Sequence, residues 1–178
     1  MRWINRYEDD NSSIAELGKV IFEGSFACTE NVNDYIVGST EEEREKRKTY
    51  VTLEYMYFFM HNFNRLAFGN LGKQRGIELQ KRLGILIIHP LVESLFEDQT
   101  DSQDQIMMEL FERLNEAEIE YSKCNTSTEL LQLIVDKISD TCGQANTPEM
   151  RGQIQDRTLA ISEKMNLEDL VNAAGEEI

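Results

Sequence analysis

The longest apolar pattern in the chain runs from Tyr50 to Phe68 and predicts a buried helix. Neither Pro nor Gly interrupts residues 40–68, so a long helix is allowed there. At about 100° per residue, apolar side chains cover one face of this helix and much of the opposite face. They are Val51, Tyr55, Phe59, Phe63 and Leu66 on one face, and Leu53, Met56, Met60 and Ala67 on the other. A helix that is apolar on most sides packs inside a fold, between other helices.

A second apolar helix is predicted after a short turn that contains Gly69 and Gly72. Its apolar positions recur at helical spacing, at Ile77, Leu79, Leu83, Leu86 and Ile87. Two long helices joined by a short connection pack antiparallel. The sequence therefore predicts a central helical hairpin, formed by residues of about 40–68 and 73–96.

Capping patterns place the starts of the other helices. Three have the form Ser/Thr-x-x-Glu, and Thr147-Pro148 combines an N-cap with a proline in the first turn. The three are Ser13-x-x-Glu16, Thr40-x-x-Glu43 and Thr126-x-x-Glu129. The first of these helices is expected to end between about 24 and 28, because Gly24 weakens it.

The strand signal is almost absent, so the predicted class is all-α. We expect residues 1–178 to form a single-domain bundle of about six helices built around the hairpin. Within it, residues 1–12 are an N-terminal arm, residues 13–98 are core helices, and residues 99–178 are acidic packing helices.

Polar residues of the aromatic helix form a stripe. Glu54, His61 and Arg65 are spaced by seven and four residues and fall within about 40° on the helix surface. Buried polar groups need partners, so the stripe is interpreted as a structural network or as the side that reaches solvent. The competing hypothesis is a ligand cleft. Its candidate lining residues are Glu54, Tyr57, His61, Arg65, His89 and Glu93.

Charge is distributed unevenly along the chain, whose net charge is −15. Residues 44–82 have a net charge of +6, whereas residues 97–178 have a net charge of −13. We favour intramolecular complementarity between these regions over a basic rim for an anionic ligand. The acidic balance argues against nucleic acid or a membrane as a partner.

Known catalytic and metal-binding motifs are not found. The chain lacks a Walker A pattern, GxGxxG and Glu-x-x-His, and the spacing of His89 and Glu93 is only a weak metal signal. We therefore assign no catalytic residue, metal or cofactor. The first residues lack an apolar signal-peptide region, and three widely spaced cysteines without a CxxC pair indicate free thiols in the cytoplasm.

Three functional hypotheses follow. The favoured one is a soluble, cytoplasmic, non-catalytic protein that acts by protein–protein interaction or as a homo-oligomer. The alternative is a bundle that binds a small anionic or metal ligand in a cleft lined by Glu54, His61, Arg65 and His89. The least favoured is an acidic mimic of nucleic acid.

Overall fold

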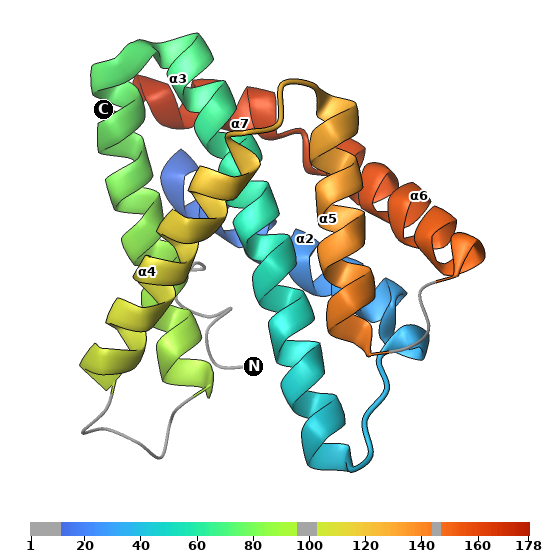
Figure 1. The fold of residues 1–178 in the computed structure, drawn as a ribbon. Coiled ribbons are helices and arrows are strands. Elements are labelled where there is room, and N and C mark those ends of the chain that lie inside the picture. Colours follow the sequence, from blue (N-terminus) through green and yellow to red (C-terminus); the bar gives the residue numbers. More distant parts are fainter. Residues whose placement is uncertain (1–11, 96–102, 144–146) are drawn as a thin grey trace.

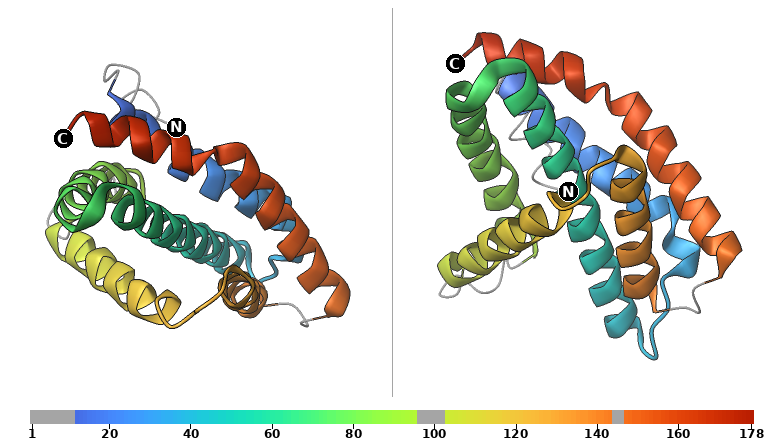
Figure 2. Two further views of the ribbon diagram at one scale, coloured as in Figure 1. Left: turned by 90° about the horizontal axis from the view of Figure 1, so that it is seen from above. Right: turned by 45° about the horizontal axis from the view of Figure 1, so that its top comes forward.

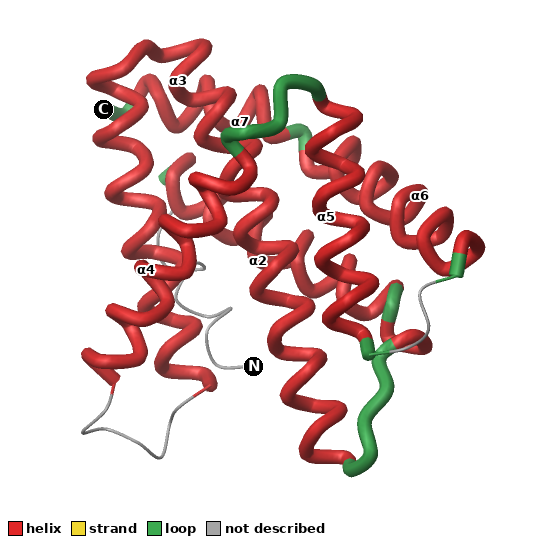
Figure 3. The backbone as a smooth tube through the Cα atoms, in the orientation of Figure 1, coloured by secondary structure: helices red, strands yellow, loops and turns green. Residues whose placement is uncertain are grey.

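Helices form every regular element of the part of the chain that the structure describes (Figure 3). The computed structural model describes residues 12–95, 103–143 and 147–178, with side chains for 12–88, 105–143 and 147–178. The elements are α2 (Ser13–Asn31), η1 (Asn33–Tyr35), α3 (Glu41–Leu95), α4 (Gln103–Tyr121), α5 (Ser127–Cys142), α6 (Pro148–Met165) and α7 (Leu167–Glu176). The all-α, single-domain class is confirmed. The expected helix count is slightly off. The two helices predicted for the hairpin run together and are counted as one element, α3.

The helices form three layers, with α3 in the middle (Figures 1 and 2). On one side lie α4 and α5, and on the other lie α2, α6 and α7. The middle layer is therefore covered on two sides, as the apolar pattern of residues 50–68 predicts. Its largest fully buried side chains include Tyr55, Phe59 and Phe63, which contribute to one continuous core.

Gly72 divides α3 into two arms, which we call the first arm (residues 41–71) and the second arm (residues 73–95). Its φ of 77° and ψ of 174° are non-helical and reverse the direction of the chain. Glycine adopts a positive φ at little steric cost, so this residue suits the position. The predicted hairpin is confirmed, but the helix continues through Gly69 and breaks at Gly72 alone.

Side-chain caps begin several helices. The hydroxyl of Thr40 accepts a hydrogen bond from Glu43 N, and Thr126 and Thr147 cap α5 and α6 in the same way. At α2 the cap is one residue earlier than predicted, because Ser12 Oγ accepts from Ala15 N. Each cap pairs a backbone N–H that the helix itself leaves without an acceptor.

The expected end of the first helix near Gly24 is wrong, since α2 continues to Asn31. Gly24 lies against α6, where a Cβ atom would be only 2.6 Å from Met165 Sδ. The glycine therefore provides room for a close helix contact. Packing against α6 and α7 offsets the low helix propensity of this residue.

The basic residues of α3 compensate the negative ends of other helices. Neither α5 nor α7 has a basic residue in its last turn. Arg47 donates to Thr141 O of α5 over 3.3 Å, and Arg75 donates to Gly175 O of α7. A cation at a helix C-terminus stabilises exposed carbonyl groups and the helix dipole. Part of the charge complementarity expected between residues 44–82 and residues 97–178 therefore acts between basic side chains and backbone carbonyl groups.

None of the described helices is long and apolar enough to cross a membrane.

Candidate functional site

The structure brings three of the six candidate residues into one buried region. Glu54, Tyr57 and His61 lie on the first arm, close to residues of α4 and α5. Arg65 is exposed to solvent. The side chains of His89 and Glu93 lie outside the described side chains. Glu54 and His61 contact residues of α4 and α5.

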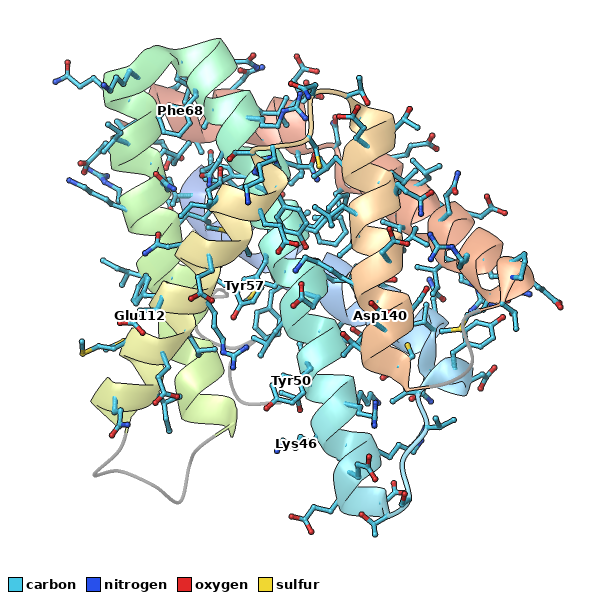
Figure 4. The ribbon with its side chains drawn as sticks, in the orientation of Figure 1. Lys46, Tyr50, Tyr57, Phe68, Glu112 and Asp140 are labelled. Carbon is cyan, nitrogen blue, oxygen red and sulfur yellow. The ribbon has the colours of Figure 1, made fainter. Side chains whose placement is uncertain are left out.

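We define the polar network by its members on three helices. It consists of Glu54, Tyr57, His61 and Asn64 on the first arm, Glu118 and Tyr121 on α4, and Lys137 on α5. The four residues of α3 recur every three or four positions, so they share one face of the helix. Figure 4 shows Tyr57 on the side of the first arm that faces α4.

His61 is almost fully enclosed, with 3% of its surface exposed. Its Nδ1 atom lies 3.1 Å from Glu118 Oε2, an ion-pair distance, although the direction of the ring N–H does not meet hydrogen-bond geometry. Asn64 Nδ2 donates to the same carboxylate oxygen over 3.1 Å. One carboxylate of α4 thus contacts two buried polar side chains of α3. The His61 ring also packs 5.5 Å from the Tyr121 ring.

Glu54 and Lys137 form the second part of the network. Lys137 Nζ lies 2.7 Å from Glu120 and 3.7 Å from Glu54, and it sits over the Tyr121 ring. Tyr121 OH lies 3.5 Å from Glu54. Burial raises the pKa of the Glu54 carboxyl, and the positive charge of Lys137 only partly offsets this. Burial lowers the pKa of Lys137, but its bonds to Glu120 and Glu54 outweigh burial and raise it.

Several polar atoms of the network are buried without a hydrogen-bond partner in the described part of the chain. They are Tyr57 OH, His61 Nε2 and Asn64 Oδ1. Burial raises the pKa of the Tyr57 hydroxyl. A buried polar atom without a partner costs about 1–3 kcal/mol, so these atoms are where a small polar molecule would gain hydrogen bonds.

The described residues contain no cluster of three or more His, Cys, Asp or Glu side chains suited to a metal ion. Burial raises the pKa of both Cys28 and Cys142 to about 12. Those thiols are therefore protonated at neutral pH and are poor nucleophiles.

A different feature lies on the opposite side of α4, and the sequence reasoning missed it. Of the large apolar side chains exposed in the described residues, the three most exposed are Met108 at 65%, Ile119 at 62% and Ile85 at 61%. Met108 and Ile119 belong to α4, and Ile85 belongs to the second arm. A signal was present, because the seam of Met107, Leu110, Leu114, Ala117 and Tyr121 leaves Met108 and Ile119 outside it.

Charged residues surround these apolar side chains. Glu112 and Glu116 are exposed on α4, and Lys81 and Arg82 are exposed on the second arm. Figure 4 shows Glu112 on the outer side of α4, away from α5. We call these seven residues the outer surface: Lys81, Arg82, Ile85, Met108, Glu112, Glu116 and Ile119.

The members of the polar network on α4 and α5 were likewise not predicted from the sequence. Glu118, Tyr121 and Lys137 lie far from the first arm in sequence, and no local pattern connects them to His61.

Comparison of the chain with protein-family models, with curated proteins and with solved structures gave no match.

Proposed function

We propose that the protein is a non-catalytic helical module that binds another protein through the outer surface. The observation that carries this proposal is the placement of the three most exposed large apolar side chains on two contacting helices. Single exposed apolar residues are common on protein surfaces. Apolar residues gathered on neighbouring helices and bordered by charged groups are typical of interaction sites.

The chemistry of these residues suits a protein partner. Met108 and the two isoleucines supply apolar area, and methionine adapts its shape to different contacts. Glu112 and Glu116 provide a charged rim that favours a partner segment with basic residues. A helical face of this kind accepts a second helix more readily than an extended peptide, because it offers no strand edge.

The polar network fits a structural role in this proposal. Its charged and aromatic groups tie α4 and α5 to the first arm, and so hold the outer face of α4 in a fixed orientation. A surface on a rigid helix binds with less loss of conformational entropy than a surface on a loop.

Site-specific photo-crosslinking in cells tests the proposal. A photoreactive residue at position 108 should give defined crosslinked protein species. The same residue at position 159 is the matched control, because Leu159 is 41% exposed on α6. Equal patterns from the two positions would remove the support for the outer surface as the binding site.

A second candidate function is the binding of a small polar ligand beside His61. The unpartnered atoms of Tyr57, His61 and Asn64 favour it, because all three lie on one face of the first arm. Exposed Arg65 speaks against the anionic class expected from the sequence. Native mass spectrometry of the purified protein should detect a bound small molecule that His61→Ala loses. A single mass equal to that of the bare chain rejects this candidate.

The cytoplasm is the compartment that we propose. Cys28, Cys124 and Cys142 are all free thiols, and free thiols are typical of proteins in reducing compartments. Burial of Cys28 and Cys142 is consistent with a packing role for these residues.

A further inference from the structure

The outer surface carries opposite charges on its two helices. On the second arm, Lys81 is exposed and forms no ion pair among the described residues, and Arg82 pairs with Glu78 of the same helix. On α4, the exposed Glu112 and Glu116 form no ion pair within the described part of the chain. Among the described residues, one surface therefore presents an unpaired lysine and an Arg82–Glu78 ion pair beside two unpaired glutamates.

The two helices come together near Gly84 and Phe111, which places these two residues at similar heights. A Cβ atom at Gly84 would lie 3.6 Å from the Phe111 ring. The second arm and α4 run in opposite directions past this point (Figure 1). With a rise of about 1.5 Å per residue, Ile85 and Met108 lie on the same side of the crossing. Lys81 and Arg82 lie on the other side, between the heights of Glu112 and Glu116.

This arrangement is complementary to itself. A second copy can be generated by rotating the molecule by half a turn about an axis that runs along the helices beside the outer surface. The second arm of each copy then faces α4 of the other copy. The rotation leaves the height of every residue along the axis unchanged. Apolar Ile85 meets apolar Met108, and basic Lys81 meets acidic Glu112. A twofold axis produces each of these contacts twice.

We propose that the partner of the outer surface is a second copy of this chain, bound about such a twofold axis. The inference rests on the proposed function and names its partner. Charge complementarity favours a second copy over a purely basic partner, because a basic partner would be repelled by the unpaired Lys81. Repulsion between two chains of net charge −15 opposes pairing, so the dimer forms most readily at high protein concentration.

Sedimentation velocity over increasing protein concentration tests this proposal. The expected result is a monomer–dimer equilibrium that Ile85→Glu and Met108→Glu each shift to monomer. The control Leu159→Glu changes an exposed apolar residue on α6 and should leave the equilibrium unchanged. Thermal unfolding followed by circular dichroism, at a concentration low enough for every variant to be monomeric, must give the same midpoint for all variants, so that lost pairing is not lost folding.

A pair of charge variants tests the twofold contact itself. Lys81→Glu and Glu112→Lys should each weaken pairing by about tenfold or more, because each places like charges together twice. An equimolar mixture of the two variants should associate again, since the mixed dimer pairs opposite charges at both contacts. Intramolecular effects of either substitution cannot produce this recovery.

Three results would overturn self-association through this surface. They are a monomer at every concentration, a dimer insensitive to Ile85→Glu and Met108→Glu, and a mixture of charge variants that stays monomeric. If the chain is monomeric but position 108 crosslinks to a different protein in cells, the second copy is rejected and the proposed function stands. If position 108 gives no specific crosslink and the chain is monomeric, both are rejected.

Discussion

On its inner side α4 places Glu118 and Tyr121 against polar groups of α3, whereas on its outer side it exposes Met108 and Ile119 to solvent. A helix at the edge of a bundle commonly exposes polar residues on its outer side. The inner side has its partners within the chain, in His61, Asn64 and Lys137. The outer side has none in the described chain. We therefore propose that one side of α4 stabilises the fold and that the other side binds a partner.

The largest effect is expected for the aromatic contact of the inner side. Tyr121 is fully buried and packs against Phe58, His61 and Lys137. Tyr121→Ala should lower the free energy of unfolding by about 3–5 kcal/mol, since a large cavity forms. Urea unfolding measures this change. Met108→Ala on the same helix is the control, and its free energy of unfolding should stay near the wild-type value. Similar losses of stability in both variants would contradict the difference between the inner and outer sides of α4.

A smaller loss is expected for the carboxylate of the inner side. Glu118→Ala removes the acceptor of Asn64 and the ion-pair partner of His61. Leaving these buried groups without a partner should lower the free energy of unfolding by about 1–3 kcal/mol. Glu116→Ala, two residues away and exposed, is the matched control in the same urea titration. Equal effects would mean that Glu118 does not hold α4.

The dependence of stability on pH tests the buried Glu54. Its pKa is raised in the folded state, so the folded protein retains a proton that the unfolded chain has lost. The contribution of Glu54 to stability is therefore present at acid pH and is lost as pH rises from the unfolded pKa of about 4.3 through the folded pKa. Relative to wild type, Glu54→Gln should become more stable as pH rises through this window. A stability difference that is constant with pH would show that Glu54 is not desolvated.

The smallest effect on stability is expected for the outer side. Met108→Gln and Ile119→Gln replace exposed apolar groups and should change the free energy of unfolding by less than about 0.5 kcal/mol. They should nevertheless weaken association, because binding depends on the apolar area that they remove. Differential scanning calorimetry of a dilute sample measures the first quantity. A large loss of stability would mean that these residues pack within the chain.

The fold was largely predictable, because its signals are local. Apolar spacing predicted the central helix, Gly72 predicted the turn of the hairpin, and Thr126 and Thr147 predicted helix starts. Gly24 misled the prediction, because its low helix propensity is local whereas its contact with Met165 comes from a distant helix. Sequence position alone does not reveal that contact.

The site was predictable only in part. Helical spacing places Glu54 and His61 on one stripe, but the partners of this stripe depend on how α4 and α5 pack against α3. Arg65 belongs to the same stripe by helical angle, yet it lies beyond the cover of α4 and is exposed. The outer surface depends on the crossing of α4 with the second arm, which no spacing in the sequence specifies.

Self-association through the outer surface can be tested by crosslinking the purified protein with a photoreactive residue at position 108. We expect a crosslinked dimer, and mass spectrometry should place the crosslink in the second arm, within residues 81–88. The dimer should disappear when Ile85→Glu is introduced into the same chain. Crosslinks confined to monomers, or dimer crosslinks that fall on α6 or α7, would contradict the account.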